Sequence, residues 1–174
     1  METKKNGDDR DIIIRELALS DSLEELTELL HRSYKQLAVM GLKYLATYQD
    51  VETTRRRIAQ GVAFVAVLDD KLVGTIVFTQ PEHTHLPKGR PIVGAGKLNQ
   101  LGVEPSSQGR GIGKRLFVHA EEYAKTRGVT ALVLDTAENA DHLIKWYERM
   151  GYKFEEYVQW DVTNYRSVVL VKYL

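Results

Sequence analysis

Hydrophobic and polar residues follow two periodicities along the chain, and together they predict an α/β protein. Short apolar runs rich in β-branched residues predict strands. These runs lie at residues 12–14, 62–68, 72–78, 93–103, 131–134, 154–159 and 166–171. Between them, leucine and alanine recur every three or four residues, which is the spacing of one helix face. The helices are expected from a cap at Ser20 or Asp21 to Gly41, and over residues 51–60, 112–127 and 140–150.

The resulting element order is β-α-α-β-β-β-α-β-α-β-β, and it predicts a single mixed sheet covered by helices. The proline- and glycine-rich segment 79–91 is expected to be a loop, and Pro105 is expected to end a strand. Residues 1–10 are polar and aperiodic, which indicates a flexible N-terminal segment. Without internal repeats or a linker, residues 11–174 are predicted to form one domain.

Composition narrows the class of protein. The chain has 174 residues, with 24 Lys and Arg against 24 Asp and Glu, and no cysteine. Zero net charge disfavours a nucleic-acid partner, and the lack of cysteine excludes disulfides and thiolate chemistry on the protein. The longest apolar run, Val62–Leu68, is far too short to span a membrane, and the N-terminus lacks a signal-peptide pattern. A soluble, cytoplasmic protein is expected.

The segment Gln108–Lys114 carries the clearest chemical signal. Its three glycines at alternate positions allow a tight bend and a close approach of the backbone to a ligand. It precedes a predicted helix, whose free N–H groups and dipole favour an anion such as a phosphate group. Arg110, Lys114 and Arg115 add positive charge, and no acidic residue lies among them.

Two well-known phosphate motifs do not match this segment. A P-loop requires Ser or Thr after Gly-Lys, and here Lys114 is followed by Arg115. A dinucleotide-binding fingerprint requires its third glycine three positions after the second. Here Gly113 lies only two positions after Gly111.

The pattern Gln108-x-x-Gly111-x-Gly113 resembles the Q/R-x-x-G-x-G/A signature of the GNAT family of N-acetyltransferases. Upstream, residues 99–105 resemble that family's fourth strand, which leads into the loop. Downstream, residues 132–140 resemble its fifth strand and the start of the next helix.

The segment Trp146–Tyr152 resembles the family's closing Tyr-x-x-x-Gly-Phe/Tyr motif. The likeness is strongest over residues 93–153. It implies a fold in which the fourth and fifth strands splay apart. It also implies an acetyl-CoA-dependent acyltransferase that uses acetyl-CoA as a co-substrate, with no metal. The positions that correspond to the family's cofactor-binding residues are Leu101, Gly102, Val103, Gln108, Gly109, Arg110, Gly111, Ile112, Gly113, Lys114 and Asn139.

By the same resemblance, Tyr147 corresponds to the usual general acid, which protonates the departing CoA thiolate. The residue types suit this step, since a phenol can protonate a thiolate at modest cost. Tyr147 also shares helical spacing with Leu143 and Met150, so packing in the core is a second expected role.

A general base is harder to assign. Several members of the family carry a Glu on the fourth strand, but this chain has none at residues 95–100. Glu104 and Asp135 are the nearby carboxylates, and Glu104 is interpreted as a surface residue. A chain of water molecules along Asn99, Gln100 or backbone carbonyls is therefore the working hypothesis for proton exit.

Other residues support weaker interpretations. In the family, the region after the first helix forms one wall of the acceptor cleft, which makes Tyr34, Tyr44 and Tyr48 candidates to line it. Structural roles suit these tyrosines at least equally. His83 and His85 have H-x-H spacing but no third ligand nearby, so a metal site is not expected. His142, at a helix start, is a minor candidate for substrate contact, and the run at residues 55–57 is interpreted as a solvated helix face.

The leading hypothesis is transfer of an acetyl group from the CoA thioester directly to a primary amine of a small molecule or peptide. The alternatives are transfer of a longer acyl group and a non-catalytic sensor that binds acyl-CoA. The balanced charge gives no preference for polycationic acceptors. The terminal strands offer edges at which a homodimer can form.

Overall fold

The computed structural model describes residues 12–84 and 92–174, and within them seven strands form one mixed sheet. The strands are β1 (Ile13–Glu16), β2 (Gly61–Leu68), β3 (Lys71–Thr79), β4 (Ala95–Val103), β5 (Ala131–Ala137), β6 (Lys153–Gln159) and β7 (Arg166–Tyr173). The helices are α1 (Leu23–Val39), α2 (Val51–Ile58), α3 (Ile112–Thr126) and α4 (Asp141–Arg149), with short 3-10 turns η1 (Leu45–Thr47), η2 (Pro81–His83) and η3 (Pro105–Ser107). The predicted α/β class and element order are confirmed.

The expected cap of α1 is wrong by one or two residues. The Ser22 hydroxyl accepts a hydrogen bond from the Glu25 N–H at 3.1 Å and so caps the helix. Asp21 instead pairs with Arg15 at 2.7 Å, which leaves its carboxylate unavailable for the helix terminus.

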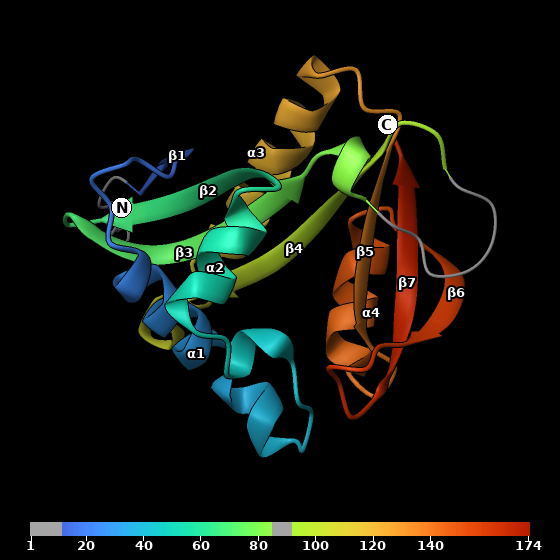
Figure 1. Cartoon of the computed structure of the whole chain (residues 1–174), viewed down its shortest axis with the longest axis horizontal. Helices are drawn as coiled ribbons and strands as arrows, with labels where there is room; N and C mark the ends of the chain where they lie inside the picture. Colours follow the sequence, from blue (N-terminus) through green and yellow to red (C-terminus); the bar gives the residue numbers. More distant parts are fainter. Residues whose placement is uncertain (1–11, 85–91) are drawn as a thin grey trace, which may run out of the picture.

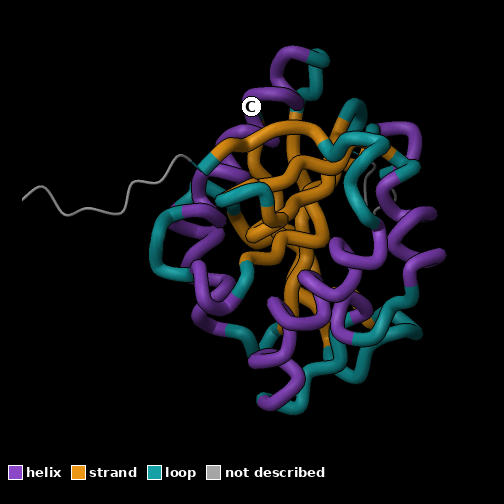
Figure 2. Tube along the Cα trace, turned by 90° about the vertical axis from the view of Figure 1, so that its left-hand side faces the viewer, coloured by secondary structure: helices purple, strands orange, loops and turns teal. Residues whose placement is uncertain are grey.

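Helices cover both faces of the sheet (Figures 1 and 2). On one face, Leu26 and Leu29 of α1 pack against Val65 and Leu72, and all four are buried. On the other face, the apolar side of α3 forms the main core with the strands and with part of α4. Because both faces are covered, β2 and β3 are apolar almost throughout, as the sequence pattern indicated.

The sheet opens between β4 and β5. These parallel strands pair only from Ala95–Lys97 to Ala131–Val133 and diverge beyond that point, as Figure 1 shows. The sheet order is β1-β2-β3-β4-β5-β7-β6, so the opening lies between an antiparallel half that ends at β4 and a second half that starts at β5. The expected splay of the fourth and fifth strands is confirmed.

A β-bulge shapes β4 at the opening. Val77 pairs with Asn99 and Thr75 with Gly102, so Gln100 and Leu101 together face Ile76. Gln100 takes a positive φ of 53°, which is uncommon for a residue other than glycine. The bulge therefore redirects the Gln100 side chain at the point where the two strands separate.

Glycine at position 102 lets α1 approach β4. A Cβ atom there would lie 3.0 Å from the Ser33 side chain, which is closer than ordinary contacts allow. This close approach makes α1 one wall of the opening. The expected flexible segment 1–10 and most of the loop at 79–91 fall outside the described residues, as does His85. In the described part of the chain, no helix combines the length and apolar character needed to cross a bilayer.

Candidate functional site

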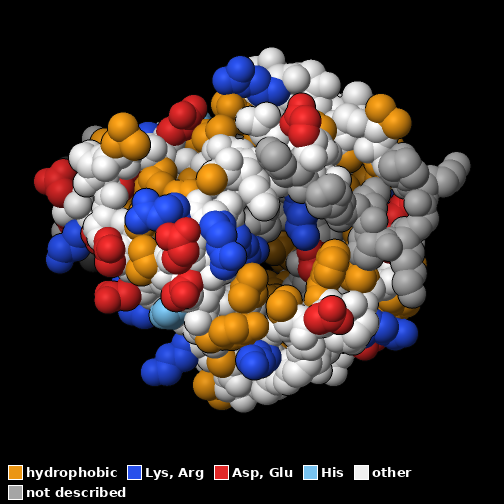
Figure 3. Space-filling model, viewed as in Figure 1, with side chains coloured by type: hydrophobic (Ala, Val, Ile, Leu, Met, Phe, Trp, Pro, Cys, Tyr) orange, Lys and Arg blue, Asp and Glu red, His pale blue; other side chains and the backbone are white. Residues whose placement is uncertain are grey.

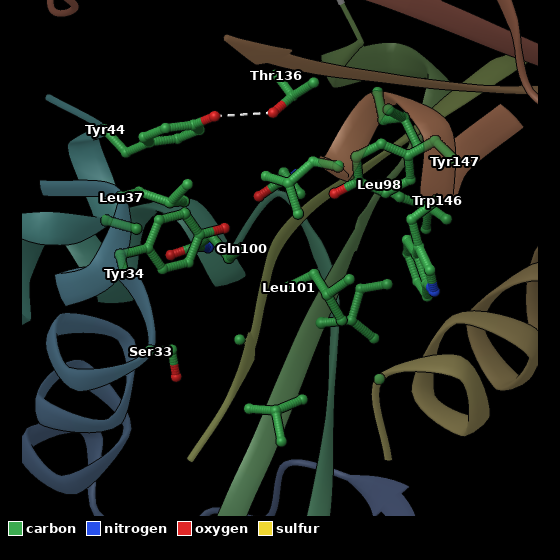
Figure 4. A pocket seen from close by; sticks show the side chains of 18 of the residues that line it. Ser33, Tyr34, Leu37, Tyr44, Leu98, Gln100, Leu101, Thr136, Trp146 and Tyr147 are labelled. Carbon is green, nitrogen blue, oxygen red and sulfur yellow. Dashed lines mark hydrogen bonds between the residues drawn. The ribbon is translucent and has the colours of Figure 1, made fainter. Parts of the chain in front are cut away.

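A cavity of about 870 Å³ occupies the opening between β4 and β5. The space-filling view shows a hollow between the two halves of the molecule, with hydrophobic and basic side chains around it (Figure 3). In close-up, Tyr34 and Leu37 come from α1, and Trp146 and Tyr147 come from α4 on the opposite side (Figure 4). Leu101 of β4 lies between these walls, so one cavity contacts both halves of the sheet.

One end of the cavity is formed by the glycine loop. Gly109 and Gly111 have φ values of 78° and 75°, which glycine adopts without strain. Gly111 is the N-cap of α3, and no side chain caps that helix. The first intrahelical bond is donated by the Arg115 N–H, so the three preceding N–H groups have no partner within the helix. The loop therefore presents free donors and the positive end of a helix dipole.

Most residues expected to bind the cofactor lie together in this cavity. Those that line it are Leu101, Gly102, Val103, Gln108, Gly109, Gly111, Ile112, Gly113 and Lys114. Arg110 belongs to the loop but is not among the lining residues, and Asn139 is exposed and lies outside the lining as well. The Gln108 side chain donates to the Val103 carbonyl at 3.2 Å, which fixes the loop against the end of β4.

Tyr147 packs against the core, which confirms the packing role expected for it, and it also lines the cavity. Its role as a general acid stays a prediction. Its ring lies 5.9 Å from that of Phe117 and 5.2 Å from that of Trp146. Its hydroxyl makes no hydrogen bond to any described residue. Burial raises the pKa of the phenol above its ordinary value, so the hydroxyl remains protonated and able to donate.

Of the three candidate tyrosines, Tyr34 lies within α1, whereas Tyr44 and Tyr48 follow it. Tyr34 and Tyr44 line the cavity, and the Tyr44 hydroxyl bonds Thr136 at 2.8 Å and the Ala137 N–H at 3.0 Å (Figure 4). Tyr48 is outside the lining, and its hydroxyl donates to the Val162 carbonyl at 2.9 Å. The Tyr34 hydroxyl, by contrast, makes no hydrogen bond to any described residue.

The two candidate carboxylate bases are both engaged in ion pairs. Asp135 lines the cavity, but it pairs with Lys97 at 2.7 Å and accepts a hydrogen bond from the Trp160 indole at 3.0 Å. Burial by itself would raise the pKa of the Asp135 carboxyl, but Lys97 and Trp160 outweigh burial and hold that pKa below its ordinary value. Glu104 is outside the lining and pairs with Arg32 at 2.8 Å.

Asn99 and Gln100, the residues of the hypothetical water path, both line the cavity. The Asn99 side chain donates to the Thr79 hydroxyl at 2.9 Å. His142 also lines the cavity, at the first turn of α4. The described residues contain no cluster of three or more acidic or histidine side chains placed to hold a metal ion.

The interpretation of residues 55–57 as a solvated face is wrong for one member of the run. Arg55 is exposed and pairs with Glu52, but Arg57 is half-buried and lines the cavity. The Arg57 guanidinium donates to the Gln49 side-chain oxygen at 2.7 Å. A signal for this placement was present, because Val51, Thr54 and Ile58 recur on one helix face, and Arg57 lies at its edge.

Comparison with known proteins agrees with this geometry. The family model described as "Acetyltransferase (GNAT) family" matches residues 23–152. Among curated proteins, the chain is 28% identical over 138 residues to the S-(2-succino)cysteine N-acetyltransferase of Bacillus subtilis (strain 168), which covers 78% of this chain and 81% of that protein.

Solved structures show the same fold at low sequence identity. The PaiA N-acetyltransferase of Thermoplasma acidophilum, determined in complex with coenzyme A, superposes with a TM-score of 0.66 at 21% identity. That match covers 94% of this chain and 99% of the other. The ribosomal-protein-alanine N-acetyltransferase of Brucella melitensis gives a TM-score of 0.68 at 19% identity, and covers 93% of this chain and 99% of the other.

A mixed sheet that opens between two parallel strands, with a glycine loop at the opening, defines the class as an acetyl-CoA-dependent acyltransferase. The chain belongs to the acetyltransferase (GNAT) family. The resemblance noted from three sequence motifs is thereby confirmed.

Proposed function

We propose that this protein transfers an acetyl group from acetyl-CoA directly to a primary amine of a small molecule or peptide. The observation that carries the proposal is the single cavity, which joins the glycine loop at one end to Tyr34, Tyr44 and Tyr147 at the other. A thioester held at the loop end and an amine held at the aromatic end would meet within one space. No covalent acyl-enzyme is needed, and the chain has no cysteine to form one.

The loop end has the donor chemistry that a pyrophosphate requires. Three amide N–H groups at the start of α3 are free of helix bonds, and Lys114 adds a positive charge at the same place. Along Leu101–Val103, β4 no longer pairs with β5, so main-chain groups on that edge are available to the amide-containing arm of CoA. The residues present therefore fit acetyl-CoA.

The reaction requires three proton movements. A lysine-like amine with a pKa near ~10.4 is neutral in only about one molecule in 2,500 at pH 7, so a proton must leave the amine before attack. The neutral nitrogen attacks the thioester carbonyl, the carbon–sulfur bond breaks, and the sulfur accepts a proton. The attacking nitrogen gives up a second proton as the amide forms, and this proton restores the group that protonated the sulfur. We assign the proton that the sulfur accepts to the Tyr147 hydroxyl, which is kept protonated by burial and lines the cavity. The amine's proton would leave through water along Asn99 and Gln100, since Asp135 is held as an ion pair.

The acceptor is proposed to be a small amine in the first instance. The Bacillus relative is named for acetylation of S-(2-succino)cysteine, a small molecule, and it aligns with most of this chain. Polycationic acceptors are disfavoured, because Asp135 is the only carboxylate among the described residues that line the cavity and Lys97 neutralises it.

The test is acceptor-dependent release of free CoA thiol from acetyl-CoA, with a panel of primary amines. The protein contributes no thiol background, because the chain has no cysteine. We expect release that requires both an amine and the protein, with the N-acetylated product identified by mass. Tight binding of acetyl-CoA without release for any amine would contradict the proposal and favour a sensor. Faster release from a longer acyl-CoA would identify the preferred acyl group as a different one.

A further inference from the structure

A buried polar chain connects α2 to the β4 bulge, and its hydrogen-bond direction is fixed. Arg57 can only donate, so the Gln49 oxygen must face it, at 2.7 Å. The Gln49 amide nitrogen then points the other way and donates to the Thr54 hydroxyl at 2.7 Å and to the Gln100 oxygen at 2.8 Å. The positive charge of Arg57 thus determines the orientation of both glutamine amides.

This row of hydrogen bonds ends at Gln100, in a donor without a partner among the described residues. The Gln100 amide nitrogen is buried and has no hydrogen-bond partner, while the residue as a whole is only 3% exposed and lines the cavity. Turning the Gln100 amide over would place two nitrogens against each other, since the Gln49 nitrogen is fixed by Arg57. The Gln100 donor therefore lies buried in the cavity wall, without a hydrogen-bond partner among the described residues.

The same wall carries an uncompensated positive charge. Arg57 has five N–H donors, of which one bond, to Gln49, is made to a described residue, and no described carboxylate forms an ion pair with it. Asp135 is already paired with Lys97. The charged side chains that line the cavity among the described residues are Arg57, Lys97, Lys114, Asp135 and Arg149, so cations outnumber the one carboxylate.

We propose that this end of the cavity binds a carboxylate of the acceptor, so that the acceptor is an amine that also bears a carboxylate, as an α-amino acid does. The inference rests on the proposed acetyltransferase function and deepens it by naming the acceptor class. A carboxylate accepts hydrogen bonds only, which matches a wall that contains the remaining Arg57 N–H groups and, buried in the same wall, the unpartnered Gln100 N–H. Bound there, it also neutralises a half-buried guanidinium that forms no ion pair with a carboxylate in the described part of the chain.

The test compares acceptors that share an amine and differ in the carboxylate. Methionine, phenylalanine and glutamate are each assayed against the corresponding α-carboxamide, and kcat/KM is measured by release of CoA thiol. Removing the carboxylate lowers the amine's pKa and so enlarges its reactive neutral fraction, which favours the amide chemically. We expect the free acids to be preferred in spite of this bias. Preference for the amides would overturn the proposal.

Two matched variants test whether Arg57 causes the preference for free acids over amides. Arg57→Met should reduce kcat/KM for the acids by about 30-fold or more, the low end for loss of one buried charge partner, and should change the amides by about twofold or less. The control is Arg56→Met, one residue away on α2, where the side chain is exposed and its described bond is to Thr53. Equal losses in the two variants, or equal losses for acids and amides, would also overturn the proposal.

A second variant avoids dependence on the folding of Arg57→Met. Gln100→Glu keeps the shape and can still accept from Gln49, but it replaces the unpartnered donor with an acceptor of negative charge. It should weaken the binding of the acids to the complex with CoA and leave the binding of the amides unchanged; turnover is not the readout for this variant, because Gln100 also lies on the proposed proton path. Binding of the acids to the complex with CoA, measured by calorimetry, separates the two proposals. Acids that bind wild type but not these variants, without turnover of any amine, would refute the transferase function alone, and absence of binding would refute the carboxylate site.

Discussion

At the scale of single residues, Tyr147 packs against the core and is also the proposed general acid. We predict that Tyr147→Phe lowers kcat by about 100-fold, the low end for loss of a general acid, while leaving stability nearly unchanged. The ring contacts with Phe117 and Trp146 are retained, and the hydroxyl has no described partner to lose. Rates with saturating acetyl-CoA and the melting temperature are the measurements.

Tyr152 supplies the control, because it is also a buried tyrosine but lies outside the cavity lining. Its hydroxyl donates to Glu121 at 3.1 Å. Tyr152→Phe should therefore lower the free energy of unfolding by about 1 kcal/mol with kcat unchanged. If Tyr147→Phe retained wild-type kcat, the CoA thiolate would be protonated by another group.

Asp135 tests the water path for proton exit. Its pKa lies below the ordinary value, so it is already ionised at neutral pH and cannot titrate there. Asp135→Asn should leave the pH–rate profile near neutrality in place, and should lower the free energy of unfolding by about 1–3 kcal/mol because Lys97 loses its partner. That stabilisation is present above the ordinary carboxyl pKa and disappears as pH falls. Loss of the neutral-pH transition in this variant would make Asp135 the base.

Residue identity alone predicted an anion-binding loop around Gly111, but it did not predict the buried hydrogen bonds that link Arg57, Gln49 and Gln100. The glycines and cations around Gly111 are contiguous in sequence, so their combined property is visible there. Gln49, Arg57 and Gln100 come from three separate segments, and their relation depends on how α2 docks beside β4. The positive φ of Gln100 has no signature in the residue type.

At the scale of elements, the two ends of α3 allow a matched comparison. Gly111 at the N-terminus and Gly128 beyond the C-terminus have φ values of 75° and 71°, and at both positions a Cβ atom would meet nothing within 4 Å. Leucine imposes a similar backbone strain at either site. We predict that Gly111→Leu abolishes binding of acetyl-CoA, whereas Gly128→Leu retains it, with similar losses of stability in both variants.

Gly113 refines the comparison. A Cβ atom there would lie 3.6 Å from the Val103 side chain, which is an ordinary contact, and the residue has no positive φ. Gly113→Ala should preserve the affinity, as measured by calorimetry. Unchanged affinity in Gly111→Leu would mean that the loop is not the phosphate site.

Element types were predicted well because each has a local cause. The periodicity of apolar residues, together with the positions of glycine and proline, predicted the strands and helices within a few residues of their observed bounds. The cap of α1 was misplaced because an ion pair with Arg15, on the preceding strand, engages the Asp21 carboxylate. Such an ion pair depends on the fold and cannot be read from spacing.

At the scale of the whole molecule, the splay between β4 and β5 determines where the site lies. Periodicity predicted the strands, but the splay itself came from the family resemblance, since nothing in the residue pattern specifies where pairing stops. The splay leaves a cavity lined by tyrosines whose hydroxyls are removed from bulk water. Because these hydroxyls are buried, the free energy of unfolding should depend on pH.

Burial raises the pKa of several tyrosines above the ordinary value near ~10. They are Tyr34, Tyr44, Tyr147, Tyr152 and Tyr165. Above that pH, the unfolded chain releases these protons while the folded chain keeps them. The free energy of unfolding should therefore be unaffected by these groups below pH ~10 and fall above it, by up to about 1.4 kcal/mol per pH unit for each such tyrosine.

Urea unfolding from pH 8 to 11 measures this dependence. Tyr147→Phe removes one of the phenols and should reduce the alkaline slope, whereas Val169→Ala, a core truncation at a residue only 2% exposed, should displace the whole curve without changing its slope. Part of the tyrosinate absorbance, that of these five phenols, should appear only with unfolding. A free energy of unfolding that stayed constant to pH 11, or equal slopes for wild type and Tyr147→Phe, would show that water reaches these phenols in the folded protein.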